Sequence, residues 1–114
     1  MKKIFLLINC LLLLVCCKTK KSNEQSGKIP DCIKASIEAF SKTSCEKGLK
    51  VNEYTFQGAT VFVFDQNACG NDMTSEVFDK NCKSLGFLGG FVGNVKIKGE
   101  DFSNALLVRT VWER

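Results

Sequence analysis

The acidic residues between positions 65 and 79 are the first candidates for chemistry, because carboxylates bind metal ions and serve as general acids and bases. The calcium-binding loop pattern D-x-[DN]-x-[DN]-G-x5-E is matched in part by Asp65, Asn67, Gly70 and Glu76. Cys69 stands where the pattern requires a further oxygen ligand, and the flanking segments alternate like strands. We therefore interpret this segment as a solvated turn and expect no metal and no cofactor.

A second, looser acidic group consists of Asp72, Glu76 and Asp79, which would supply paired carboxylates to a hydrolase. Nothing in this spacing requires catalysis, and acidic residues at strand ends are normally solvated. The chain has no histidine, which excludes Ser-His-Asp triads, histidine general bases and most zinc sites. We expect a non-enzymatic protein without catalytic residues, and a hydrolase acting through Asp72 or Asp79 stays an alternative.

Cysteines are unusually frequent, with seven in 114 residues, and three of them lie within the first 17 positions. The four that remain are Cys32, Cys45, Cys69 and Cys82. An even number of cysteines in a small exported domain is typical of a disulfide framework, here with three possible pairings. No C-x2-4-C pair is present among these four, so the spacing argues against a zinc site.

The spacing of the four cysteines favours one pairing. Cys45 lies 13 residues before Gly58 and Cys69 lies 11 after it, so a hairpin turning at Gly58 brings the two together at its open end. Cys32 is then left to pair with Cys82. The rival pairing, Cys32–Cys45 with Cys69–Cys82, requires the chain to double straight back along the first helix.

The most distinctive segment is 85–94, in which four glycines interleave with Phe87, Leu88 and Phe91. One interpretation is a bulged strand and turn whose glycines supply positive φ angles while the aromatic residues face the core. The other is a loop that presents Phe87, Leu88 and Phe91 to a partner protein or an apolar ligand. The first interpretation is favoured, and the second identifies the candidate partner-binding residues.

The N-terminal segment has the features of an export signal. A basic start precedes the apolar run Ile4–Val15, which is interrupted only by Asn9 and is too short to span a bilayer stably. The run ends at Cys16 and Cys17 and resembles a bacterial lipoprotein signal, in which the cysteine becomes the lipidated N-terminus. A plain secretory signal or a short membrane anchor is the alternative.

Two cysteines compete for the lipid. The residue before the modified cysteine must be small, and Cys16 is compact whereas Val15 is branched, so Cys17 is favoured and Cys16 is the alternative. Residues 18–28 contain no apolar side chain and predict a flexible polar tether. Two or more acyl chains anchor a protein stably, so the first expected partner is the membrane, reached through the N-terminal lipid.

The charge of the remaining chain excludes nucleic acid as a partner. The formal net charge is +4, but residues 29–114 contain 10 Lys and Arg against 11 Asp and Glu, a net charge of −1. Nucleic-acid binding needs a clustered basic face. We expect three parts: a signal at 1–17, a tether at 18–28 and one globular domain at 29–114.

The helical part of the domain is predicted near its start. Ile33, Ile37 and Phe40 recur at helical spacing, so a helix opens at 29–31 and ends near 41–44.

The rest of the domain has the alternation of strands. The expected strands are 52–56 and 60–64 around a turn at 57–59, then 76–79, 85–91 and 105–112. The last strand should carry Leu106, Val108 and Trp112 on one face. These elements predict an α+β fold: one N-terminal helix packed on a small antiparallel sheet of four to five strands, stabilised by disulfides.

Several segments in order resemble a family of small Bacteroidota lipoproteins that carry a domain of unknown function. The resemblance spans 29–113. Many relatives carry a cysteine pair where this chain has Ala68-Cys69 and further cysteines near positions 86 and 99, where it has Gly86 and Gly99, and this chain has Cys45 instead, so the resemblance implies no disulfide pairing. It supports the fold and the location and gives no catalytic residues. The matching elements are Ile29-Pro30-x-Cys32-Ile33, Val51-x-Glu53-Tyr54-x-Phe56-x-Gly58-x-x-Val61, Cys69-Gly70-Asn71-Asp72, Asp79-x-Asn81-Cys82, Gly89-Gly90-Phe91-x-Gly93, Asp101-Phe102 and Val111-Trp112.

Together these features predict an exported cell-envelope lipoprotein, anchored in the outer membrane and facing the periplasm. We expect a non-enzymatic binding or structural module whose second partner is another envelope protein. A small inhibitor of a secreted or envelope hydrolase is the alternative.

Overall fold

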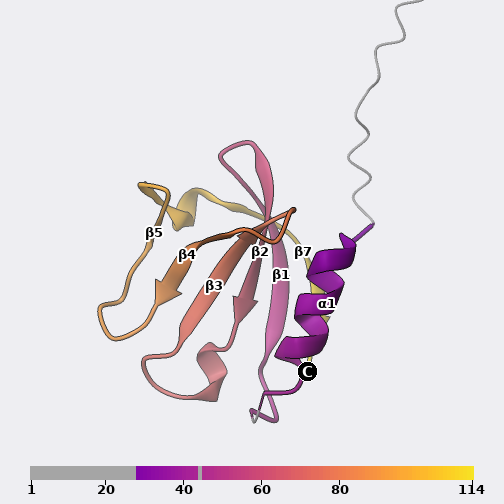
Figure 1. Ribbon diagram of the computed structural model, residues 1–114. Coiled ribbons are helices and arrows are strands. Elements are labelled where there is room, and N and C mark those ends of the chain that lie inside the picture. The colour runs from indigo at the N-terminus through magenta and orange to yellow at the C-terminus, as the bar shows by residue number, and fades with distance from the viewer. Residues whose placement is uncertain (1–27, 44) are drawn as a thin grey trace, which may run out of the picture.

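The computed structural model describes residues 28–43 and 45–114, in which one helix packs on a five-stranded antiparallel sheet (Figure 1). The strand order is β4-β3-β2-β1-β7, and β5 pairs with β6 in a separate hairpin. The predicted α+β fold is therefore confirmed. The elements are α1 (Asp31–Phe40), β1 (Lys50–Phe56), β2 (Ala59–Asp65), η1 (Asn67–Cys69), β3 (Thr74–Asp79), β4 (Ser84–Gly89), β5 (Lys96–Ile97), β6 (Glu100–Asp101), η2 (Phe102–Asn104) and β7 (Leu106–Glu113).

The hairpin of β1 and β2 forms the centre of the sheet. Its turn consists of Gln57 and Gly58, with φ angles of 52° and 74°, as a two-residue turn between twisted strands requires. Phe56 pairs with Ala59, so the turn is one residue shorter than the 57–59 turn predicted from the sequence. The difference arises because Ala59 already belongs to the ladder.

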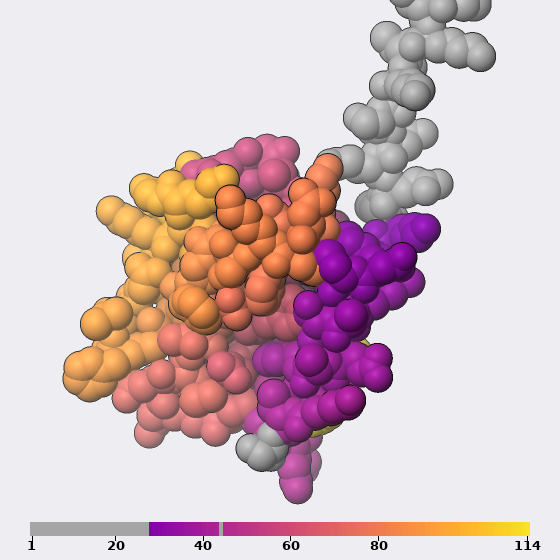
Figure 2. Space-filling model, in the orientation of Figure 1, coloured from indigo at the N-terminus to yellow at the C-terminus, as the bar shows by residue number. Residues whose placement is uncertain are grey.

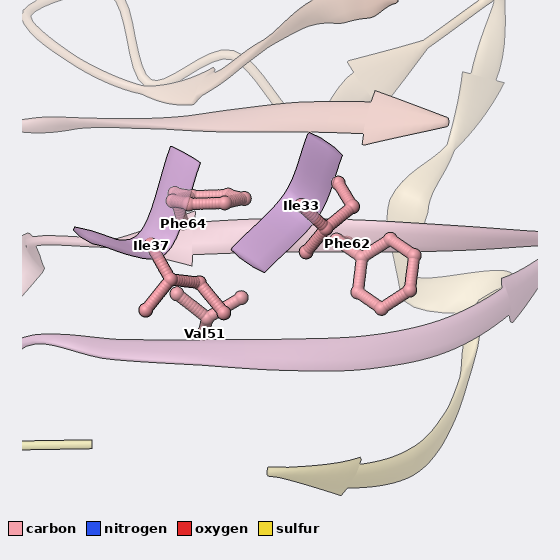
Figure 3. Close-up of a cluster of buried hydrophobic side chains, with 5 residues drawn as sticks. All are labelled: Ile33, Ile37, Val51, Phe62 and Phe64. Carbon is pink, nitrogen blue, oxygen red and sulfur yellow. The ribbon is translucent and has the colours of Figure 1, made fainter. Parts of the chain in front are cut away.

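The first core cluster fills the space between α1 and the sheet. Figure 3 shows Ile33 and Ile37 of the helix directed towards the strand residues Val51, Phe62 and Phe64, and all five side chains are buried. Burial of such side chains contributes about 1.5–3 kcal/mol each. The predicted helical stripe is therefore the surface that docks α1.

The last residue described, Arg114, fastens the C-terminal end of α1. Its guanidinium donates hydrogen bonds to the carbonyl oxygens of Ser41 and Cys45, the second at 3.0 Å. It also lies 5.7 Å from the ring centroid of Trp112. Cationic groups near the end of a helix satisfy its free carbonyl groups and its dipole.

The second core cluster lies on the opposite face of the sheet. Residues 95–104, which contain β5, β6 and η2, cover this face (Figure 1). Ile97 is 1% exposed, and the ring of Phe102 lies 5.1 Å from that of Tyr54 and 5.0 Å from that of Phe56. Ile97 and Phe102 thus anchor residues 95–104 to this face of the sheet.

Strand β7 departs from the simple alternation that the sequence predicted. Its pairing with β1 shifts register between Val51 and Asn52 and again between Glu53 and Tyr54. Each bulge reverses the face to which the following side chains point. Leu106 pairs with Thr55 and Trp112 with Val51, which lie on the same side of β1, so these two side chains share a face as predicted, whereas Val108 falls at the second bulge and was wrongly included.

Two polar pairs bridge β1 and β7, one on each face. The guanidinium of Arg109 donates a hydrogen bond to the carboxylate of Glu53 at 3.0 Å and forms an ion pair with it. Glu53 is paired with Phe62 across the β1–β2 ladder, so this ion pair lies on the helix face. The hydroxyl of Thr110 donates to the side chain of Asn52 at 2.7 Å on the other face. Both β1 residues are buried, so these bonds satisfy polar groups that water does not reach.

Candidate functional site

The four cysteines of the domain form two disulfides. Cys32 is bonded to Cys82 and Cys45 to Cys69, with Cα–Cα distances of 6.1 and 5.6 Å. Both distances lie within the usual range of about 4.4–6.8 Å. This is the pairing that the hairpin argument favoured, and the rival pairing was wrong. Disulfides are stable in oxidising compartments, so the domain belongs outside the cytoplasm.

The register of the central hairpin explains why Cys45 meets Cys69. Lys50 pairs with Asp65, and extending this register by five residues places position 70 opposite Cys45. Cys69 is therefore only one residue away from facing its partner. Cys32 lies in the first turn of α1, and its bond to Cys82 joins the helix to the turn between β3 and β4. The other predicted cysteine site, Cys17 with Cys16 as alternative, lies outside the described residues.

Two of the acidic candidates, Asp65 and Asp79, have structural roles in turns, whereas Glu76 lies within β3. The carboxylate of Asp65 accepts a hydrogen bond from the backbone N–H of Asn67 at 2.8 Å. The carboxylate of Asp79 accepts from the backbone N–H groups of Asn81 and Lys83 at 2.8 and 2.9 Å. Across residues 28–43 and 45–114, no three metal-binding side chains come together. The segment that resembles a calcium loop is therefore a turn closed by a disulfide at Cys69.

The glycine-rich segment after β4 forms a tight turn with an exposed apolar tip. Gly93 donates its backbone N–H to the carbonyl oxygen of Gly90 at 3.0 Å, which closes residues 90–93 into what we call the tip turn. Its two central residues, Phe91 and Val92, are 89% and 84% exposed. In Figure 2 the orange chain that follows β4 projects at the left edge of the molecule.

Backbone and side-chain hydrogen bonds hold the tip turn rigidly. The backbones of Gly89 and Asn94 exchange two hydrogen bonds of 2.8 and 3.0 Å at its base. The side-chain amide of Asn94 donates to the carbonyl oxygens of Phe87 and Lys96 at 2.6 and 2.9 Å. These four hydrogen bonds, two between backbone groups and two from the side chain of Asn94, restrict the loop before any partner binds.

The glycine at the base of the turn also permits a close contact with the neighbouring strand. A Cβ atom at Gly89, whose φ angle is +80°, would lie 3.0 Å from the carbonyl oxygen of Met73. That same oxygen accepts the backbone N–H of Gly90 at 3.1 Å. Glycine is therefore required at position 89 by conformation and by space.

The three residues predicted to contact a partner point in different directions. Leu88 packs into the second core cluster, whereas Phe87, its neighbour on the strand, lies on the helix face and is half-exposed. Phe91 lies in the tip turn. Strand alternation separates the first two residues, so Phe87, Leu88 and Phe91 do not form one surface. Val92 and Asn94 were not predicted to contact a partner, because the role of each depends on the conformation of the turn.

The helix face carries the second candidate site, a cavity of about 360 Å³ between α1 and strands β2, β3 and β4. We call it the phenylalanine pocket. It exists because α1 packs over the β1–β2–β7 half of the sheet and leaves β3 and β4 clear (Figure 1). It is lined by Ser36, Ala39, Phe40, Phe64, Gln66, Thr74, Glu76, Phe78 and Phe87.

These features define a small disulfide-bonded α+β domain. Residues 37–114 match the sequence profile of the family described as Domain of unknown function (DUF6970), and the chain belongs to this family. No curated protein and no solved structure matches the chain. Among the residues that the structure describes, no helix is long and apolar enough to cross a membrane.

Proposed function

We propose that this protein is a bacterial cell-envelope lipoprotein whose domain is a non-enzymatic binding module, held at the membrane by a lipid on Cys17. The proposed location is the outer membrane facing the periplasm, and the proposed bacterial group is the Bacteroidota. Support comes from the signal-like segment that ends at Cys17, from the polar tether at 18–28 and from the two disulfides.

The observation that carries the binding role is the tip turn. Phe91 and Val92 are almost fully exposed side by side, and exposure of apolar surface costs about 25 cal/mol per Å² relative to burial. Asn94 fixes the turn in advance, so a partner loses little of its binding free energy to ordering the loop. Aromatic side chains are common at the energetic centres of interfaces. The second proposed partner is therefore an envelope protein with an apolar pocket.

Photo-crosslinking in living cells tests this role. A benzophenone amino acid at position 91 should give a discrete adduct, whereas the same group at position 106, which is also exposed, should not. Adding Val92→Ser or Asn94→Ala should reduce the adduct at position 91. Equal adducts at both positions, or an adduct unaffected by either substitution, would contradict the proposed role of the tip turn.

Metabolic labelling with a palmitate analogue tests the anchor separately. The wild-type chain and the Cys16→Ala variant should incorporate the label, and Cys17→Ala should not. Labelling that survives Cys17→Ala and is lost in Cys16→Ala would assign the lipid to the alternative residue. An unlabelled wild-type chain would favour a plain secretory signal.

A small inhibitor of a secreted or envelope hydrolase is the alternative role, and the rigid, projecting tip turn is the observation that favours it. A panel of such hydrolases would be assayed with the wild-type chain and with Phe91→Ser. Inhibition that Phe91→Ser abolishes would support this role. Uniform lack of inhibition would remove it.

The non-enzymatic assignment is supported by the roles of the acidic side chains. Asp79 already accepts two backbone hydrogen bonds within its turn, which leaves a proposed hydrolase little freedom at this carboxylate. Any hydrolytic activity that disappears in both Asp72→Asn and Asp79→Asn would refute the assignment. Activity unaffected by the two substitutions would exclude a hydrolase that acts through Asp72 or Asp79.

A further inference from the structure

We propose that the phenylalanine pocket binds a small organic cation, a primary ammonium group carried on an apolar body. This inference rests on a different surface from the tip turn and goes beyond the proposed envelope role. It is based on three properties of the pocket: its aromatic walls, its single carboxylate and its volume.

The walls of the pocket are aromatic and fixed in place. The ring of Phe64 lies 5.3 Å from that of Phe40 and 5.1 Å from that of Phe78, both in edge-to-face contact. Phe87 closes the β4 side and is half-exposed, because no helix covers it. The faces of aromatic rings attract cations, and they also bury the apolar part of an amphipathic ligand.

The only charged residue in the lining is Glu76. It pairs with Phe64 on β2 and with Phe87 on β4, so its side chain lies between two phenylalanines in one row across the sheet. Within residues 28–43 and 45–114, no lysine or arginine forms an ion pair with Glu76 and no side chain donates a hydrogen bond to it. The carboxylate is thus an unmatched charge in a site whose other polar lining residues, Ser36, Gln66 and Thr74, are neutral.

Charge and volume together select the ligand class. A carboxylate flanked by aromatic rings repels anions and attracts cations, and a charge-assisted hydrogen bond to an ammonium group is stronger than one to a hydroxyl group. The volume of about 360 Å³ lies at the lower end of ligand pockets, which span about 300–1,000 Å³. A phenylethyl-sized amine suits this space.

Three probes of nearly equal shape test the charge preference: 2-phenylethylammonium, 2-phenylethanol and phenylacetate. The full chain in phosphatidylcholine nanodiscs would be titrated with each, and protein-free nanodiscs would correct for partition into lipid. Trp112 is the only tryptophan of the chain, and its ring lies 6.0 Å from that of Phe40, so its emission reports on the pocket wall. Calorimetry would give the dissociation constants independently.

We expect the ammonium probe to bind with a dissociation constant of about 1 mM or lower and about tenfold more tightly than the alcohol. Phenylacetate should bind most weakly. Glu76→Gln keeps the shape of the side chain and should remove the preference for the ammonium probe. The matched control Glu46→Gln removes the same charge outside the pocket and should leave the preference intact.

A second variant tests whether the probes bind in the phenylalanine pocket, and it does not change the charge of the protein. Ala39 is exposed on α1 and lines the pocket, so Ala39→Leu should narrow the cavity and weaken the binding of all three probes. The domain should stay folded, because the side chain at position 39 is not part of the core. The proposal is overturned if the alcohol binds as tightly as the ammonium probe, if Glu76→Gln leaves the preference unchanged, or if the ammonium probe does not bind at millimolar concentration. Crosslinking at the tip turn is unaffected by either result, so the two proposals fail independently.

Discussion

The two faces of the sheet are covered in different ways. On one face, α1 is held at its first turn by the Cys32–Cys82 disulfide and at its end by Arg114. On the other, residues 95–104 contain only short elements and are held by the buried side chain of Ile97 and the partly buried ring of Phe102. The comparison shows that a polar segment without a disulfide covers a core face when a few apolar side chains anchor it.

The largest effect is expected on the face without a disulfide. Ile97→Ala removes the only fully buried side chain of residues 95–104 and should lower the free energy of unfolding by about 2–5 kcal/mol. Urea denaturation measures this loss, and hydrogen exchange should show faster exchange of amides in this segment. Val95→Ala is the control, because Val95 is 55% exposed, and it should change little. Equal losses in both variants would contradict the anchoring role of Ile97.

The disulfide on the helix face should contribute slightly less. Replacing Cys32 and Cys82 together by serine removes the constraint on the unfolded chain and should cost about 2–4 kcal/mol. The amides of α1 should then exchange faster than those of β2 and β3. Unchanged protection of α1 in the variant would show that Ile33 and Ile37 hold the helix without the covalent bond.

The two polar pairs between β1 and β7 allow the two faces to be compared through smaller changes in stability. Arg109→Met leaves the buried carboxylate of Glu53 without its partner and should cost about 1–3 kcal/mol. Thr110→Val leaves the neutral side chain of Asn52 without its hydrogen-bond donor and should lower the free energy of unfolding by about 1 kcal/mol. Thermal or urea unfolding of both variants provides the test. A larger loss in Thr110→Val would reverse the expected order.

The smallest effect is expected from pH, on the face covered by residues 95–104. The backbone N–H of Ser103 donates to Asp101, and together with the Ser103 hydroxyl it lowers the pKa of Asp101 below its ordinary value of 3.8. The folded state is then stabilised above about pH 3.8, and this contribution is lost as the pH falls through the lowered pKa. NMR should show acid loosening η2 before α1, and Asp101→Asn should show no such step. If η2 and α1 loosened at the same pH, the proposed contribution of Asp101 would be contradicted.

The helix face and the central hairpin were predictable because their signals are local. Ile33 and Ile37 repeat at helical spacing, and Gly58 marks the turn that brings Cys45 near Cys69. Strand 74–79 was predicted two residues too short, and strand 84–89 was shifted by one or two residues. Such boundaries depend on the neighbouring strand and not on the segment's own pattern.

The other face and the pocket were not predictable for a physical reason. Strands β5 and β6 have two residues each, too few for alternation to be visible. Asn94 orders the tip turn through carbonyl groups of Phe87 and Lys96, which only the folded chain brings together. Glu76 enters the phenylalanine pocket because α1 stops short of β3 and β4, a matter of helix length and docking position.

The two disulfides are nested, since the Cys45–Cys69 loop lies wholly inside the Cys32–Cys82 loop, and this has a mechanical consequence. A force applied along the chain from the N-terminal side enters at Cys32 and passes directly to Cys82, so the 50 peptide units between them never carry load. Pulling on the two chain ends should therefore give an extension shorter by about 170 Å in oxidising than in reducing buffer, at about 3.3–3.6 Å per residue. Breaking the inner bond alone should leave that extension unchanged. Helix α1 and strands β1 to β3 are thereby shielded from any tension transmitted by an N-terminal attachment.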